Sequence, residues 1–306
     1  VMAFTTSDGI TWTNIWNSTN LSQVIYEIAI GDFDSDGNQD DVVAVGDDGR
    51  ILVLQGDNGT LIFNTSVIDT GTGIRSVAAI DLDHDGFNNE ILLGDIHDVF
   101  AFKWNGTYGA EMSDSCDGGI TGCIWRKPLS SSYIYELAVL DLDSDGWNDD
   151  FVIGSGSGTT GYFRGYDNNS NSLWNFTAPT LTVKSISIGD INDDGINDIM
   201  AGGDDNILWA VNKSGDFIFS FEVNHDIGYS YPTGSSQATD IGDVNKDGIL
   251  DIGIASRDDY GYIIQQVNCI AEFNDSNEYN MTWNKTIRKW QISRNFSTPG
   301  TYNYNV

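Results

Sequence analysis

Short apolar runs alternate along the chain with short acidic segments that contain glycine. Apolar runs precede four of these segments at 26–31, 76–80, 135–140 and 185–189, and others follow them at 41–46, 91–94, 151–154 and 199–202. Runs of about four to eight residues, rich in β-branched side chains and closed by glycine, are typical of β-strands. The first unit adds two more runs, at 50–55 and 60–64. The pattern predicts an all-β protein whose units each hold four short antiparallel strands.

The five acidic segments share one pattern. They begin at Asp32, Asp81, Asp141, Asp190 and Asp243 and read DFDSDGNQD, DLDHDGFNN, DLDSDGWND, DINDDGIND and DVNKDGILD. Side-chain oxygens fall at positions 1, 3, 5 and 9 of each loop, and glycine falls at position 6. Calcium takes about six to eight oxygen ligands, and short Asp and Asn side chains converge on one ion where glycine permits a sharp turn. We therefore predict up to five Ca²⁺ ions.

The predicted ligands are side-chain oxygens at positions 1, 3, 5 and 9 and the backbone carbonyl at position 7. The side-chain ligands are Asp32, Asp34, Asp36 and Asp40; Asp81, Asp83, Asp85 and Asn89; Asp141, Asp143, Asp145 and Asp149; Asp190, Asn192, Asp194 and Asp198; and Asp243, Asn245, Asp247 and Asp251. The carbonyl ligands are those of Asn38, Phe87, Trp147, Ile196 and Ile249. The second loop is expected to bind more weakly because Asn89 replaces a carboxylate, although the adjacent Glu90 can compensate.

An EF-hand is excluded by the residue at position 12, where that motif carries a bidentate Glu. The five loops have Val43, Leu92, Val152, Ala201 and Ile254 there. The starts of successive loops are 49, 60, 49 and 53 residues apart. A repeat of about 40 to 50 residues with four strands is the signature of a β-propeller blade. The longest unit contains an insertion at 109–123, which we expect to be a surface loop.

On these five loops the chain resembles the FG-GAP or VCBS repeat propellers, whose best-known members are the integrin α-subunit head domains. The resemblance covers about residues 22–280 and implies a propeller with calcium at the blade rim, serving adhesion, carbohydrate contact or extracellular architecture. The letters F-G and G-A-P survive only loosely, as in Ile30-Gly31 and Val45-Gly46. Integrin propellers have seven blades, and this chain is too short for seven.

The predicted fold is therefore one β-propeller domain over residues 1–306. Its blades are expected at about 22–68, 73–130, 132–178, 182–224 and 235–290. Residues 1–16 and 287–306 contain further strand-like stretches. These terminal strands either close the ring as a sixth blade, which removes exposed sheet edges, or pair with a neighbouring molecule.

The chain carries 45 acidic and 14 basic residues, a formal net charge of −31. A polyanion repels phosphate, so nucleic acids and anionic membranes are disfavoured as partners. No run is long and apolar enough to predict membrane insertion. The calcium loops account for part of the negative charge.

The sequence also predicts an extracellular or cell-surface glycoprotein. Twelve N-x-S/T sequons occur, at Asn17, Asn20, Asn58, Asn64, Asn105, Asn168, Asn175, Asn212, Asn274, Asn280, Asn284 and Asn295. We expect several of them to carry glycans, although Asn, Ser and Thr are also common turn residues. Cys116 and Cys123 bracket a six-residue loop and are placed to form a disulfide in an oxidising compartment. Cys269 is expected to be a buried thiol.

No motif for a catalytic nucleophile or a catalytic metal is present, so we predict no enzymatic activity. The expected function is structural or adhesive, as a subunit of a filament or surface layer that associates with itself, another surface protein or a glycan. A lectin-like adhesin and a calcium-dependent polysaccharide lyase are the alternatives. Trp174 and Trp209 are expected in the core, Trp147 at the surface, and His84 facing solvent.

Overall fold

The computed structural model describes residues 1–7, 10–19, 21, 23–65, 73–95, 97–103, 115–116, 120–121, 123–129, 133–156, 160–178, 182–192, 194–228, 238–246, 248–258, 260–264, 270–273, 278–280, 282–284, 289–291 and 304–305. These residues form β-strands, turns and irregular segments. Among them, no helix is long and apolar enough to cross a membrane.

Four sheets of four antiparallel strands form the body of the protein. The first contains β3 (Ile25–Gly31), β4 (Asp41–Gly46), β5 (Ile51–Leu54) and β6 (Leu61–Asn64). The second contains β7 (Ser76–Ile80), β8 (Glu90–Gly94), β9 (Asp98–Lys103) and β12 (Cys123–Pro128). The third contains β13 (Tyr133–Leu140), β14 (Asp150–Gly156), β15 (Gly161–Tyr166) and β16 (Ser172–Ala178). The fourth contains β17 (Val183–Gly189), β18 (Asp198–Gly203), β19 (Ile207–Val211) and β20 (Phe217–Glu222).

Smaller sheets precede, interrupt and follow these four. An N-terminal hairpin pairs β1 (Met2–Thr5) with β2 (Thr13–Asn17), and β10 (Ser115–Cys116) pairs with β11 (Ile120–Thr121) inside the insertion. The fifth sheet has three described strands, β21 (Thr239–Gly242), β22 (Asp251–Ala255) and β23 (Gly261–Ile264). Towards the C-terminus, β24 (Ile270–Phe273) pairs with β25 (Glu278–Asn280) and β28 (Tyr304–Asn305), and β26 (Thr282–Asn284) pairs with β27 (Lys289–Gln291).

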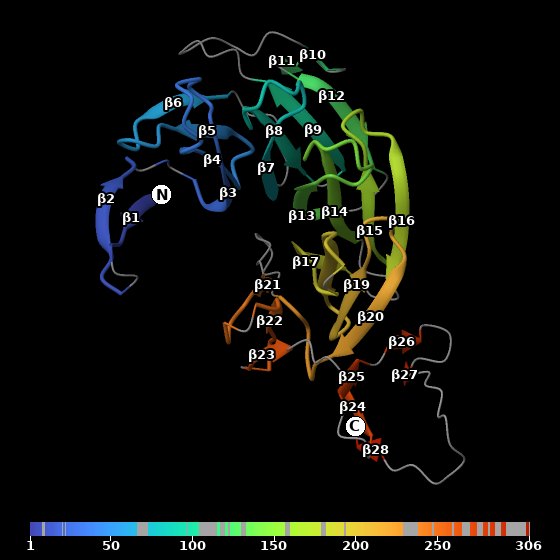
Figure 1. Ribbon diagram of the computed structural model, residues 1–306. Helices are drawn as coiled ribbons and strands as arrows, with labels where there is room; N and C mark the ends of the chain where they lie inside the picture. The colour runs from blue at the N-terminus through green and yellow to red at the C-terminus, as the bar shows by residue number, and fades with distance from the viewer. Residues whose placement is uncertain are drawn as a thin grey trace.

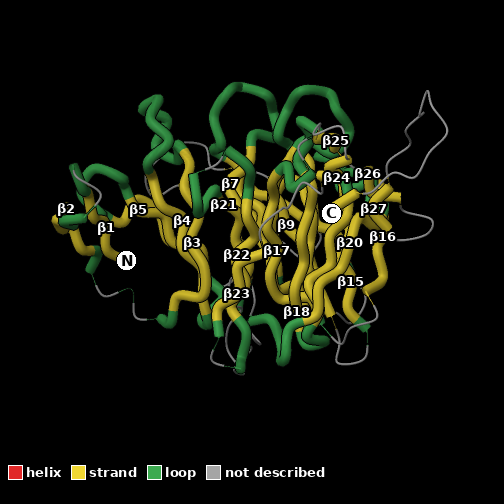
Figure 2. The backbone as a smooth tube through the Cα atoms, turned by 60° about the horizontal axis from the view of Figure 1, so that its bottom comes forward, coloured by secondary structure: helices red, strands yellow, loops and turns green. Residues whose placement is uncertain are grey.

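The sheets stand side by side along an arc (Figure 1). The first strand of each sheet lies on the inner side of the arc, and the inner strands contact one another in the order β3, β7, β13, β17, β21. The last strand of each complete sheet lies on the outer side. Figure 2 shows the same strands from another side, with loops at both ends of the sheets. Because the chain enters every sheet at its inner strand, the acidic loops join equivalent strands throughout.

Apolar side chains fill the space between each pair of neighbouring sheets. Val43 and Val53 of the first sheet pack with Val77 and Leu93 of the second. Comparable clusters join the second sheet to the third, the third to the fourth, and the fourth to the fifth. The central strands of the second, third and fourth sheets are therefore covered on both faces, which explains their continuous apolar sequences. Burial of these strands supplies the main favourable term in folding, at about 25 cal/mol per Å² of apolar surface.

The N-terminal hairpin covers only part of the near face of the first sheet. Trp16 packs against Val42 and Leu54, and its indole N–H donates to the carbonyl of Gly56. Ile28 lies opposite Ala44 on the inner part of this face and stays 48% exposed. Residues at the same place in the later sheets are 2–5% exposed, namely Val77, Leu137, Ile186 and Thr239. The inner half of this face is uncovered in the described structure.

The prediction of repeated four-stranded antiparallel units is confirmed for four sheets. The five residues at loop position 12 are at most 3% exposed, so they belong to the core and cannot serve as the closing ligand of an EF-hand. Trp174 and Trp209 pack against the core between the third and fourth sheets, as expected, whereas Trp147 is 40% exposed. Closure of a ring remains a prediction, because the described C-terminal strands β27 and β28 pair with β26 and β24 rather than with β1 or β2. Most of the predicted surface loop at 109–123, and Cys269, lie outside the described residues.

Candidate metal centres

The acidic loops share one backbone conformation. The described residues at position 4 have φ between 59° and 70°, and they are Ser35, His84, Ser144 and Lys246. The glycines at position 6 have φ between 83° and 97°, and they are Gly37, Gly86, Gly146, Gly195 and Gly248. A Cβ atom on these glycines would meet nothing within 4 Å. Glycine is therefore required for its backbone conformation and not for space.

Backbone N–H groups hold the carboxylates in place. The carboxylate at position 1 accepts from the N–H of glycine 6 in every loop, as where Gly37 donates to Asp32 Oδ2 at 3.0 Å and Gly86 donates to Asp81 Oδ2 at 2.9 Å. The carboxylate at position 5 accepts from the N–H of position 7 in the first four loops, as where Trp147 donates to Asp145 Oδ1 at 2.8 Å. These bonds turn successive carboxylates toward the inside of the loop.

A buried acidic residue opens the second strand of each sheet. These residues are Asp41, Glu90, Asp150, Asp198 and Asp251, all at most 2% exposed. Four of them accept a hydrogen bond from the backbone at the start of their own loop, as where Leu142 and Asp143 donate to Asp150 Oδ2. Their carboxylates therefore fasten the loop to the sheet and face its first residues.

The strand-end carboxylate occupies position 10 in the first three loops and position 9 in the last two. The ladder shows the difference, because Leu140 pairs with Asp150 across the third loop and Gly189 pairs with Asp198 across the fourth. The fourth and fifth loops are one residue shorter between the paired strands. In the first three loops the predicted position-9 ligands Asp40, Asn89 and Asp149 therefore lie one residue before the buried acidic residue that opens the strand. In the last two loops the position-9 residue is itself that buried acidic residue.

Carboxylate oxygens gather within 4.8 Å of one another in the first three loops. The groups are Asp32, Asp34 and Asp36; Asp81, Asp83 and Asp85; and Asp141, Asp143 and Asp150. In the second loop, Asn89 Oδ1 is also buried without a hydrogen-bond partner. Hard oxygen donors at this spacing fit calcium better than a soft metal. In the fifth loop Asp247 lies outside the described residues, so its full ligand set is not described.

The clustered charges also act on one another. Burial, opposed by backbone hydrogen bonds and assisted by neighbouring aspartates, raises the pKa of Asp41 and of Asp150 to about 6. Burial, followed by Asp36 and three other aspartates, raises the pKa of Asp40. A bound divalent cation would reverse this repulsion, because opposite charge favours the ionised form.

Lys103 distinguishes the second loop from the others. Its ammonium group extends from β9 and forms ion pairs with both Asp83 and Glu90. Asp83 is a predicted ligand, and Glu90 is the residue expected to compensate for Asn89. Hydrogen bonds to these carboxylates raise the pKa of Lys103 against the opposing effect of burial, so the amine stays charged. A calcium ion in this loop must compete with that charge. The competing charge of Lys103 supports the expectation that the second loop binds calcium more weakly. Lys103 lies outside the loop, so the loop sequence alone did not indicate this effect.

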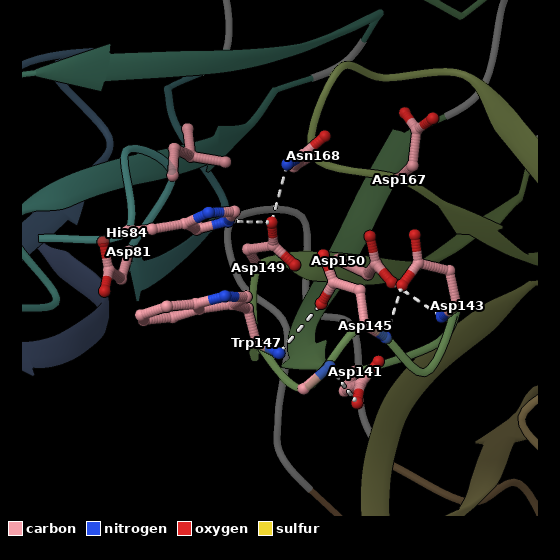
Figure 3. Close-up of polar contacts among 12 residues, drawn as sticks. Asp81, His84, Asp141, Asp143, Asp145, Trp147, Asp149, Asp150, Asp167 and Asn168 are labelled. Carbon is pink, nitrogen blue, oxygen red and sulfur yellow. Dashed lines mark hydrogen bonds and ion pairs between the residues drawn. The ribbon is translucent and has the colours of Figure 1, made fainter. Parts of the chain in front are cut away.

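His84 links the second loop to the third (Figure 3). Its ring stacks on Trp147 with centroids 4.5 Å apart and an interplanar angle of 6°, and Nε2 lies 2.7 Å from Asp149 Oδ2. Asn168 Nδ2 donates to the same oxygen at 2.6 Å. The side chain of His84 is 32% exposed, so it faces solvent in part as expected, but its contacts with the third loop were not predicted. The hydrogen bond to Asp149 raises the pKa of His84.

Neighbouring loops lie side by side on one rim of the arc. Asp32 N donates to the carbonyl of Asn88, which joins the first loop to the second. His84 joins the second loop to the third, and Gly189 lies beside Leu250 of the fifth loop. The candidate centres thus form a row along the boundaries between sheets.

Replacing Gly146 with Ala is expected to weaken calcium binding by the third loop about tenfold. The open space around the new Cβ means that the cost, about 1–2 kcal/mol, comes from φ near 97° alone. Isothermal titration calorimetry with calcium would measure it. Gly242→Ala is the matched control, since that glycine also has open space but no positive φ. Equal affinity in both variants would contradict the conformational role of Gly146.

Six sequons lie among residues whose side chains are described. Asn17, Asn58, Asn64 and Asn175 are exposed, whereas Asn168 and Asn212 are half-buried. The other six lie outside, in whole or by their side chains: Asn20, Asn105, Asn274, Asn280, Asn284 and Asn295. Cys123 is disulfide-bonded. The side chain of Cys116 is not among those described, so its pairing with Cys123 stays a prediction.

Comparison with models of known protein families finds no match. Comparison with curated protein sequences finds no relative either. The chain is an all-β protein of repeated four-stranded antiparallel sheets, with acidic loops able to hold metal ions on one rim.

Proposed function

We propose that the protein is an extracellular, N-glycosylated, calcium-binding β-propeller of the FG-GAP or VCBS type, and that it acts as a structural subunit of a filament or surface layer. Calcium would fix the loop between the first and second strands of each sheet. The repetition of one loop geometry in all five sheets is the observation that carries this proposal. No enzymatic activity is part of it.

The proposed calcium role rests on folding thermodynamics. The unfolded chain does not bring the aspartates of a loop together, so each bound ion adds its binding free energy to the stability of the folded state. Millimolar extracellular calcium suits sites with dissociation constants of about 10⁻⁴ to 10⁻³ M. A polyanionic surface protein outside the cell would therefore remain folded where calcium is plentiful.

The proposed assembly rests on the uncovered part of the first sheet. Ile28 and Ile30 are 48% and 58% exposed, whereas later sheets bury the equivalents of Ile28 and half-bury those of Ile30 against a neighbouring sheet. The hairpin β1 and β2 corresponds to the outer half of a sixth sheet, and its inner half is missing among the described residues. We assign that place to a neighbouring copy of the chain, since the terminal strands β27 and β28 pair with β26 and β24 and not with β1 or β2.

Electron microscopy of the purified protein, with calcium and with a chelator, tests the proposal. Ordered polymers that dissolve on chelation are expected. Dispersed single particles in calcium, at high protein concentration, would refute the structural role and direct attention to soluble ligands.

Ile28→Ser is expected to abolish polymers while lowering the free energy of unfolding of the dispersed subunit by about 1 kcal/mol or less. Ile28 is 48% exposed in the single chain, so its loss removes fewer contacts there than it does in the assembly. Ile186→Ser is the matched control, because Ile186 occupies the same place in the fourth sheet and is 2% exposed. That substitution should destabilise the subunit by about 2–4 kcal/mol. A similar loss of subunit stability in Ile28→Ser would show instead that the chain closes its own ring.

A lectin-like function is the second candidate, and Trp147 favours it. Its indole is 40% exposed at position 7 of the third loop, braced by His84 and next to the acidic cluster. Flat aromatic faces stack on sugar rings, and a calcium ion bound in the loop can coordinate the hydroxyl oxygens of a sugar. Calcium-dependent binding to a glycan array that is lost in Trp147→Ala would support this function.

A further inference from the structure

The inner strands carry a polar residue five positions before each of the first four loops, at Glu27, Ser76, Glu136 and Ser185. An inner strand is the edge of its sheet, so some of its backbone N–H groups have no partner in the ladder. Two of these polar side chains accept a hydrogen bond from such an N–H group on the next inner strand. Val77 N donates to Glu27 Oε2 at 2.8 Å, and Thr239 N donates to Ser185 Oγ at 3.0 Å. The residues thus connect successive inner strands.

Glu27 and Glu136 are the acidic members of this set, and their carboxyl groups are hydrogen-bonded to each other. They come from β3 and β13, the inner strands of the first and third sheets, which both contact β7 of the second. Glu136 is 4% exposed. The backbone of β7 also contacts Glu27, through the Val77 N–H. One polar contact therefore joins three successive sheets.

Two carboxylates in such a contact repel each other, and a hydrogen bond between them needs a proton. Burial raises the pKa of Glu27 from 4.5 to about 7. Burial and the charge of Glu27 raise the pKa of Glu136 well above its ordinary value. The pair therefore retains a proton at a pH where an exposed glutamate has lost it.

The cations on neighbouring elements have other partners. Arg75 lies over the rings of Tyr133 and Tyr135, with its guanidinium carbon 4.8 Å and 5.6 Å from the ring centroids. Lys184 of β17 pairs with Asp204. The other titratable groups on the strands packed against β3 and β13 are Tyr26 on β3 itself and Asp41, Glu90 and Asp150 at the loop ends of β4, β8 and β14. After burial, the charge of Glu27 is the next largest influence on Glu136, and the Glu136 carboxyl acts in turn on Glu27.

We propose that Glu27 and Glu136 share one proton, and that this proton fastens the inner strands of the first three sheets to one another. Loss of the shared proton leaves two adjacent carboxylates on the inner side of the arc and weakens the association of these strands. The Glu27–Glu136 pair is separate from the calcium loops, whose first ligands Asp32 and Asp141 lie five residues further along the chain. It goes beyond the proposed structural function and does not depend on it.

Infrared spectroscopy of the folded protein in saturating calcium tests the shared proton directly. Near pH 6, the wild type is expected to show the carbonyl band of a protonated carboxylic acid, with intensity lost in Glu27→Gln and in Glu136→Gln. Glu222→Gln is the control, because Glu222 is exposed on β20 and its substitution should leave the band unchanged. No band that depends on Glu27 or Glu136 would overturn the proposal.

Thermal unfolding gives a second readout. The folded protein holds a proton that the unfolded chain releases. The contribution of this pair to the free energy of unfolding is therefore complete below about pH 4.5 and is lost as the pH rises to about 7. The melting temperature of the wild type should fall by about 5 °C more over this range than that of Glu136→Gln, whose amide stays neutral. Equal pH dependence in wild type, Glu136→Gln and Glu27→Gln would refute the proposal. If one variant fails to fold, the other variant and the wild-type band still decide the question.

Discussion

Removing calcium is expected to lower the melting temperature of the protein by about 20 °C. At about 10 mM calcium, a site with a dissociation constant of about 10⁻⁴ M stabilises the folded state by about 2.7 kcal/mol. Five such sites approach the whole unfolding free energy of a typical domain, about 5–15 kcal/mol. Chelation also leaves the aspartates of each loop to repel one another. Differential scanning calorimetry in calcium and in chelator would measure the shift.

Magnesium is the matched control for this experiment. It requires nearly octahedral geometry and gives up its water reluctantly, so it should restore little of the lost stability at the same concentration. Equal rescue by magnesium would show that the loops respond to ionic charge in general. A melting temperature that does not change on chelation would contradict the calcium assignment itself.

The sequence predicted the repeated sheets well because strand and loop signals agreed in each unit. The run at 41–46 is apolar, ends in glycine and follows a turn that only glycine at position 6 allows, and it coincides with β4. Propensity, pattern and turn chemistry indicated the same structure there, and such agreement is what specifies a fold. These local signals therefore located the strands on both sides of the first four loops.

The candidate site was predicted less completely, because several of its features depend on contacts between units. Lys103 lies 20 residues beyond Asp83, and His84 lies 65 residues before Asp149, yet both pairs meet in the folded protein. Sequence spacing within one loop cannot indicate a partner from another strand or another sheet. The sequence also could not predict the register between the paired strands, since a loop of eight residues and a loop of nine both fit the repeated aspartate pattern.

Asp150→Asn is expected to lower the calcium affinity of the third loop at least about tenfold, a loss of about 1.4 kcal/mol. Asp150 lies with Asp141 and Asp143, within 4.8 Å, so its charge acts on the ion directly. The amide oxygen of the new side chain can still accept the N–H groups of Leu142 and Asp143. Calorimetric titration should therefore show one weakened site in a folded protein.

Asp149→Asn is the matched control, one residue away and with the same change of charge. In the structure, Asp149 Oδ2 faces His84 and Asn168, so this substitution should weaken the link between the second and third loops more than calcium binding. A greater loss of affinity in Asp149→Asn than in Asp150→Asn would reverse the assignment. It would mean that calcium draws Asp149 away from His84, and that the repeated pattern identifies the ligand better than the register of the strands does.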